Sequence, residues 1–183
     1  MRKIESKSIN SQLQLPFQAT RDIYLKQIFN VLRKYFNLEI NTNQKLIDLG
    51  SGDGSIILYS VLNYKIISVG VEINKGLINE TRGKIKELKE GKKYNSKDLR
   101  KIKLKNEDLF EQDLKNYDFI YIYSLPTMQK FLKHVFNTAK KGAIIISYKY
   151  SLTEYDSFLK LVHKLNLEED QEKISVYYYR KFI

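Results

Sequence analysis

The segment Lys45-Leu46-Ile47-Asp48-Leu49-Gly50-Ser51-Gly52-Asp53-Gly54-Ser55 decides the fold that we expect for this chain. A short apolar run contains an acidic residue near its end, and three glycines follow at alternate positions before Ile56-Ile57-Leu58 opens a helical pattern. Glycine has no Cβ, so a strand that turns into a helix through glycines brings bare backbone close to a ligand. The segment therefore predicts a buried strand, a ligand-binding turn and a helix.

Segments of helix and strand character alternate on both sides of this turn. Helical spacing of apolar residues predicts helices over residues 21–37, 56–62, 75–89, 127–140 and 154–165, with Thr20 placed to cap the first. Runs rich in β-branched residues predict strands over 46–49, 65–72, 102–105, 118–123 and 143–148, and the alternating stretch 174–180 suits a final strand. This order predicts an α/β, Rossmann-like fold, with a mostly parallel twisted sheet, an antiparallel C-terminal edge strand and helices on both faces.

Length and composition favour a single globular domain over residues 1–183, in which residues 1–19 form an arm or lid. The absence of cysteine excludes disulfides and thiolate sites, and with only two histidines we expect no metal site. No apolar segment approaches the roughly 20 residues needed to span a bilayer, and the first residues lack the apolar core of a signal peptide. We therefore expect a cytoplasmic monomer without a membrane span.

Positive charge is concentrated in one part of the chain. The formal net charge is +11, and residues 82–105 contain eleven basic and three acidic residues, a net charge of +8. Such a segment could attract nucleic acid or an acidic protein surface. The alternative is a plain solvated helix face and loop.

Two acidic residues have the spacing of a nucleotide site. Asp48 lies at the carboxyl end of the first expected sheet strand, where open α/β sheets bind ligands. Glu72 ends the next strand, close to the ~20 residues at which an acid accepts hydrogen bonds from ribose hydroxyls. Nicotinamide enzymes also place an acid there, but their glycine pattern is Gly-x-Gly-x-x-Gly, which differs from glycines at 50, 52 and 54. A tight structural turn without a ligand would leave the spacing of the two acids unexplained.

These motifs carry a resemblance to a known family. Asp48-Leu49-Gly50-Ser51-Gly52-Asp53-Gly54 resembles the first motif of S-adenosylmethionine (SAM)-dependent methyltransferases. The chain as a whole is similar to the small protein-lysine methyltransferases related to the ATP synthase c-subunit lysine methyltransferase and its archaeal relatives. The stretches that carry the wider resemblance are Pro16-Phe17 with Thr20, Val69-Gly70-Val71-Glu72-Ile73-Asn74, Leu125-Pro126-Thr127-Met128 and Ser175-Val176-Tyr177-Tyr178-Tyr179.

The resemblance implies SAM as the cofactor and S-adenosyl-L-homocysteine as its product. It implies that Asp108 takes the adenine amino group, whereas the alternative is that Asp108 only caps a helix. The full set of cofactor-binding residues that we expect is Phe17, Thr20, Asp48, Gly50, Ser51, Gly52, Gly54, Glu72, Ile73, Asn74, Glu107, Asp108 and Leu109.

The residues expected to present the acceptor are Tyr123, Ser124 and Pro126, at the end of the strand over 118–123. Their aromatic and hydroxyl groups could orient an amine, although the tyrosines could equally be ordinary strand aromatics. The resemblance implies methyl transfer to lysine ε-amines of protein substrates. The alternatives are an RNA or DNA methyltransferase that uses the basic segment, and a binding module that has lost catalysis. Enzymes that methylate exocyclic base amines usually carry Asn/Asp-Pro-Pro-Tyr/Phe, from which Ser124-Leu125-Pro126-Thr127 differs at both ends.

Overall fold

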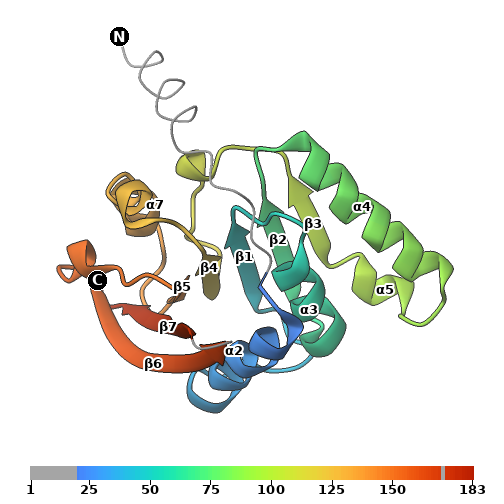
Figure 1. The fold of residues 1–183 in the computed structure, drawn as a ribbon. Helices are drawn as coiled ribbons and strands as arrows, with labels where there is room; N and C mark the ends of the chain where they lie inside the picture. Colours follow the sequence, from blue (N-terminus) through green and yellow to red (C-terminus); the bar gives the residue numbers. More distant parts are fainter. Residues whose placement is uncertain (1–19, 170–171) are drawn as a thin grey trace, which may run out of the picture.

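The computed structural model describes residues 20–169 and 172–183, and within them one seven-stranded sheet organises the chain (Figure 1). The strands are β1 Lys45–Leu49, β2 Ile67–Val71, β3 Ile102–Lys105, β4 Phe119–Ile122, β5 Ile144–Tyr148, β6 Leu159–Glu169 and β7 Glu172–Lys181. The α-helices are α2 Asp22–Tyr35, α3 Ser55–Tyr64, α4 Lys75–Glu90, α5 Ser96–Leu99, α6 Pro126–Gln129 and α7 Lys133–Asn137. Two short 3₁₀ turns are η1 Leu109–Glu111 and η2 Thr153–Tyr155.

The strand order β3-β2-β1-β4-β5-β7-β6 places the candidate site. Strands β1 to β5 pair in parallel, so their carboxyl ends meet at one edge of the sheet. The chain builds outward from β1 first to β2 and β3, and then to the other side through β4. The edge above β1 and β4 is therefore the switch point at which open α/β sheets bind ligands.

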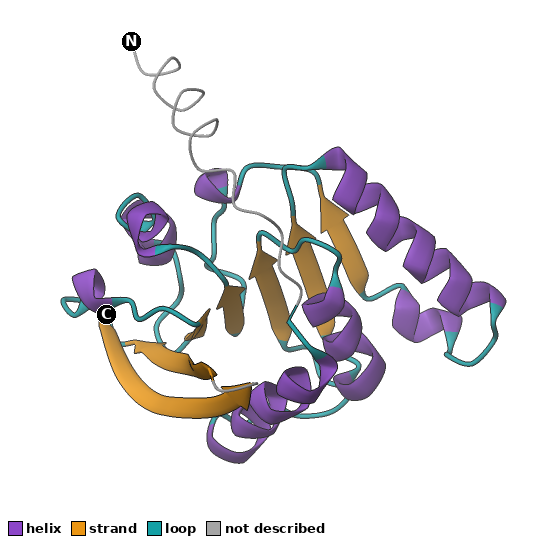
Figure 2. Cartoon of the chain, in the orientation of Figure 1, coloured by secondary structure: helices purple, strands orange, loops and turns teal. Residues whose placement is uncertain are grey.

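Helices cover both faces of the sheet, as Figure 2 shows. On one face, α2 and α3 bury Leu25, Ile28 and Ile57 against strand residues such as Leu46 and Ile146. On the other face, α7 packs Val135 and Phe136 against the inner strands. The Rossmann-like fold expected from the sequence is confirmed, including β3 over the predicted residues and helices α3 and α4 close to the predicted bounds.

The helix predicted over 154–165 is wrong. Only η2 is helical there, and β6 follows it as a long strand that pairs antiparallel with β7 along its whole length. A bulge between Leu161 and His163 shifts the register, so Leu159 packs on one face of the sheet and Leu165 and Leu167 pack on the other. The strand over 174–180 is antiparallel, as predicted, but it lies inside the sheet because β6 occupies the edge.

Two smaller expectations near the site are also corrected. The helix predicted over 127–140 is split into α6 and α7. Helix α6 ends at Gln129, because the Gln129 carbonyl accepts hydrogen bonds from the Leu132 amide and from the Tyr155 hydroxyl. Thr20 does not cap α2, whose N-cap is Arg21, a residue without a side-chain capping hydrogen bond. The Thr20 hydroxyl instead lies 3.0 Å from the Tyr121 hydroxyl.

Helix α4 packs directly on the glycine turn between β1 and α3. Gly54 has a φ of +78°, and a Cβ added there would lie 2.4 Å from Cγ2 of Thr81, a buried residue of α4. Both the backbone conformation and the close helix contact therefore require glycine.

We expect Gly54→Ala to lower the free energy of unfolding by about 1–3 kcal/mol, the usual order for a non-glycine residue held at positive φ, with the clash against Thr81 adding to it. Gly83→Ala is the matched control. Gly83 lies in α4, and a Cβ added there meets no atom within 4 Å. That control should leave stability unchanged or raise it slightly, since alanine favours helix. Urea unfolding of both variants measures the difference, and equal stabilities would contradict the packing argument.

Candidate functional site

The carboxylate of Glu72 connects the two loops at the carboxyl ends of β1 and β2. One oxygen accepts a hydrogen bond from the Gly52 amide at 2.9 Å, and the other accepts one from the Asn74 amide at 2.8 Å. The side chain is buried, so these bonds form away from bulk water. A carboxylate has about four acceptor positions, so Glu72 can hold both loops and still accept from a ligand.

The loop after β2 is fixed by two asparagines. Asn74 caps α4, since its Oδ1 accepts from the amides of Gly76 at 2.8 Å and Leu77 at 3.4 Å. Asn106, which follows β3, donates from Nδ2 to the carbonyls of both Glu72 and Ile73 at 2.9 Å. Ile73 itself is 61% exposed, so its side chain is available to a ligand at this edge. The role of Asn106 was not predicted from the sequence. Its position directly after a predicted strand was the signal that could have indicated this role.

Asp48 is a buried acid near the carboxyl end of β1. It pairs in register with Tyr121 of β4, so the two side chains leave the sheet on the same face. Burial raises the pKa of the Asp48 carboxyl well above its usual value, and the nearby Glu72 and Asp53 carboxylates raise it further. Within the described residues no hydrogen bond to this carboxyl is found. A cation bound beside it would relieve this unfavourable environment.

Two serine hydroxyls nearby are buried without a hydrogen-bond partner in the described part of the chain. These are Ser51 Oγ in the glycine turn and Ser124 Oγ after β4. Buried polar atoms are normally hydrogen-bonded, and those that are not usually serve a ligand or water. A buried acid, two buried hydroxyls without a partner and the exposed Gly50 of the glycine turn suit a ligand with cationic and hydrogen-bonding groups. The residues present therefore fit the SAM that the resemblance implies.

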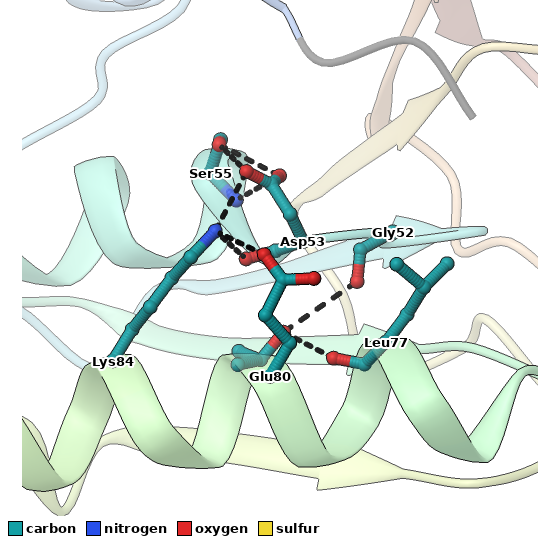
Figure 3. Close-up of polar contacts among 7 residues, drawn as sticks. Gly52, Asp53, Ser55, Leu77, Glu80 and Lys84 are labelled. Atoms are coloured by element: carbon teal, nitrogen blue, oxygen red, sulfur yellow. Dashed lines mark hydrogen bonds and ion pairs between the residues drawn. The ribbon is translucent and has the colours of Figure 1, made fainter.

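The outer side of the glycine turn is tied to α4 by an ion pair (Figure 3). Lys84 Nζ lies 2.8 Å from Asp53 Oδ2 and 3.1 Å from Glu80 Oε1. Burial acts to raise the pKa of Asp53, but hydrogen bonds from Lys84 and Ser55 outweigh it and lower that pKa. Thr81 adds a hydrogen bond to the Gly52 carbonyl at 3.5 Å. In the sequence, Lys84 was counted only as part of the basic segment, because nothing local reveals its partner.

The segment after β3 lies beside the glycine turn. Leu109 Cδ2 comes within 3.7 Å of the place where a Cβ on Gly50 would stand. Asp108 accepts from the Phe110 amide at 2.9 Å and so caps η1, the alternative considered from the sequence. The Glu107 carboxylate accepts hydrogen bonds from Gln112 Nε2 at 3.0 Å and from Lys105 Nζ at 3.3 Å. The hydrogen bond from Gln112 is the main cause of the lowered pKa of Glu107. Cofactor roles for Asp108, Leu109 and Glu107 stay predictions.

Tyrosine rings gather at the carboxyl ends of β4 and β5. The ring of Tyr123 lies edge-on to Tyr148 at 5.3 Å and stacks with Tyr150 at 6.4 Å, while Tyr121 is 6.4 Å from Tyr148. Burial raises the pKa of the Tyr123 hydroxyl, so this phenol stays neutral at physiological pH. We call Tyr121, Tyr123, Tyr148 and Tyr150 the tyrosine cluster.

The predicted acceptor-presenting residues follow directly after β4. The Ser124 carbonyl accepts from Gln129 Nε2 at 3.3 Å, and Pro126 opens α6. The structure thus brings these residues to the same sheet edge as Asp48 and Glu72. Phe17 lies outside the described residues. No group of three or more acidic, histidine or cysteine side chains in the described ranges could hold a metal, and no described helix is long and apolar enough to cross a bilayer.

We expect Asp48→Asn to stabilise the ligand-free protein. Because the folded-state pKa of Asp48 is raised, the folded state binds this proton more tightly, and the stability that Asp48 contributes falls as pH rises from about 4 toward the raised pKa. The amide avoids that loss, so the variant should gain stability relative to the parent as pH increases over this range. Urea unfolding from pH 4 to pH 8 measures the difference. A variant that is less stable than the parent at pH 8 would contradict the assignment.

With this geometry established, sequence comparison identifies the family. The model of the ANTKMT methyltransferase domain matches residues 48–157, which is more than half of the chain. The lysine N-methyltransferase of the ATP synthase c-subunit from Caenorhabditis elegans is 28% identical over 127 residues, which are 68% of this chain. The match spans only 62% of the length of that relative.

Comparison with solved structures supports the same fold. An RNA methyltransferase from Salinibacter ruber, in complex with S-adenosyl-L-homocysteine, superimposes with a TM-score of 0.73 at 20% identity, over 90% of this chain and 94% of that one. The tRNA methyltransferase TrmK of B. subtilis gives a TM-score of 0.64 at 18% identity, over 85% and 65% of the two chains. The chain belongs to the ANTKMT methyltransferase domain family.

Proposed function

We propose that this methyltransferase transfers its methyl group to lysine ε-amines of protein substrates. The observation that carries the proposal is the tyrosine cluster at the carboxyl ends of β4 and β5, next to the segment Ser124-Leu125-Pro126-Thr127. The lysine N-methyltransferase from Caenorhabditis elegans, at 28% identity, supports it.

The chemistry explains why aromatic rings suit this position. SAM, when bound, supplies a methyl group on a sulfonium, and its transfer is an in-line displacement that depends mainly on positioning and desolvation. A lysine amine has an unperturbed pKa of about 10.4, so a site must favour its neutral form. Neutral tyrosine rings make the surroundings less polar, which favours loss of the proton. Their faces can also hold the methylated, cationic product.

Methylation of RNA or DNA is the second candidate. The basic segment over 82–105, with a net charge of +8, favours it, and the two solved structures from Salinibacter ruber and B. subtilis are RNA methyltransferases by name. At 18–20% identity, however, those structures show only that the fold is shared. The segment after β4 has Ser124 and Thr127 where base N-methyltransferases typically have Asn or Asp before the prolines and Tyr or Phe after them. We therefore favour a protein acceptor.

Incubation with methyl-labelled SAM and cell extract, followed by protease or nuclease, distinguishes the two candidates. We expect the label to vanish with protease and to persist after nuclease, with acid hydrolysis releasing methyl-lysine. Glu72→Gln serves as the inactive control, because it removes the charge that holds both loops. Label that survives protease and disappears with nuclease would refute the proposal.

Removal of the central ring of the tyrosine cluster tests its role in acceptor binding. We expect Tyr123→Ala to lower kcat/KM for a labelled protein substrate by about tenfold, the equivalent of roughly 1.4 kcal/mol, while the affinity for SAM stays unchanged. The matched control is Tyr35→Ala, a ring on α2 that is 49% exposed and stacks on His163 at 4.8 Å. An equal loss in both variants would show that the effect is not local.

A further inference from the structure

A groove at the β3 edge of the sheet lies outside the candidate site at the carboxyl ends of the strands. It has a volume of about 450 Å³. Helix α4, strand β3, and helix α5 together with its C-cap residue Arg100 form its walls. Figure 1 shows α4 and α5 next to β3 at the edge of the sheet opposite β6. We call it the basic groove, because four of its lining residues are Arg82, Lys86, Lys89 and Arg100.

The positive charge of this rim is poorly compensated. Within the described residues, the ion pair found at the rim joins Lys86 to Glu90 at 3.7 Å, and both side chains are mostly exposed. Arg82 donates to the neutral amide oxygen of Asn79 at 3.2 Å. Residues 82, 86 and 89 lie on one side of α4, where positions three and four apart are neighbours. The rim therefore presents a row of cations along the helix.

The floor of the basic groove is aliphatic. It consists of Ile85 from α4, Leu99 from α5, and Ile102 and Leu104 from β3. Positions two apart point to the same face of a strand, so Ile102 and Leu104 lie side by side toward α4. None of the lining residues is aromatic. Single-stranded nucleic acid is usually held by aromatic rings on which bases stack, in addition to basic side chains.

This combination selects one kind of partner. An aliphatic floor under a cationic rim matches a peptide segment that alternates carboxylates with leucine or isoleucine, because its apolar side chains are buried while its acids face the rim. A nucleic acid would satisfy the rim and leave the floor unused.

From this match we infer that the basic groove docks an acidic, aliphatic segment of the protein substrate, away from the acceptor lysine. The inference rests on the proposed function for the identity of its partner. The groove lies at the edge strand β3, whereas the tyrosine cluster lies at the carboxyl ends of β4 and β5, which β2 and β1 separate from β3. Docking at the β3 edge would raise the effective concentration of a tethered lysine at the tyrosine cluster. The groove would then act on KM and leave kcat unchanged.

Binding is tested first, without SAM, by fluorescence anisotropy. The probe is a labelled 12-residue peptide of alternating glutamate and leucine, compared with its glutamine version and with a 12-nucleotide single-stranded RNA. We expect the double variant Lys86→Glu and Arg100→Glu to weaken peptide binding by about tenfold and to reduce its salt dependence. Lys26→Glu with Lys141→Glu is the matched control, since both lysines are exposed and lie outside the groove, and it should bind as the parent does.

The aliphatic floor provides the decisive comparison. Ile85→Ser should weaken binding of the glutamate–leucine peptide and leave RNA binding unchanged, with thermal unfolding confirming that the variant is folded. RNA that binds more tightly than the peptide, and that is weakened by the rim variant but not by Ile85→Ser, would overturn the inference. So would equal loss of peptide binding in the rim variant and in the matched control.

Kinetics then separates this inference from the proposed function. A lysine peptide that carries the acidic, aliphatic segment should show a KM about tenfold lower than the same peptide without it, and the rim variant should abolish the difference at unchanged kcat. Equal KM values for the two peptides would overturn the docking role. If neither peptide is methylated while groove binding persists, the proposed function fails and the preference of the groove for acidic segments stands.

Discussion

The two hydrogen bonds accepted by the Glu72 carboxylate are the constraint on which the site depends. They join the backbone of the glycine turn after β1 to the backbone of the loop after β2, at 2.9 and 2.8 Å. The glycine turn alone would have several accessible conformations, because glycine lacks the Cβ that restricts the backbone of other residues. One buried acid thus holds two loops in register, at the sheet edge where open α/β folds bind ligands.

Helix α4 extends this constraint outward. Its N-cap Asn74 is bonded to Glu72, Thr81 contacts the glycine turn, and Lys84 is paired with Asp53 on the far side of that turn. The helix is therefore fixed to the site along about three turns, since residues 74 and 84 are about 15 Å apart along a helix axis. The face of α4 that carries Arg82, Lys86 and Lys89 therefore has a fixed position relative to the candidate site, as a docking surface on this helix requires.

The sequence was informative where a local pattern determines the structure. The glycine turn, the acids at positions 48 and 72, and the β-branched strands were all predictable, because periodicity and the lack of a Cβ act over a few residues. The segment over 154–165 was mispredicted because its apolar residues fit helical spacing as well as strand spacing. What decided its structure was pairing with β7, a contact that is absent from the local sequence. The split of the helix over 127–140 has the same origin, since it depends on a hydroxyl from Tyr155. The structural roles of Asn106, Thr81 and Lys84 were not predicted for the same reason. Each of them bonds to a residue more than 25 positions away and fixes the backbone without contacting a reacting group.

Asp48 illustrates why such supporting contacts are needed. Burial raises the pKa of its carboxyl, the nearby Glu72 and Asp53 carboxylates raise it further, and Asp48 stands beside its register partner Tyr121 of β4. An acid in this position is unfavourable for the ligand-free fold and favourable for a bound cation, because one positive charge offsets the repulsion of the acids. The ion pair of Lys84 offsets part of the same repulsion by neutralising Asp53 from the outside. The fold therefore tolerates an acid that it does not need for stability, and the resulting negative potential is directed at the sheet edge where a sulfonium is expected to bind.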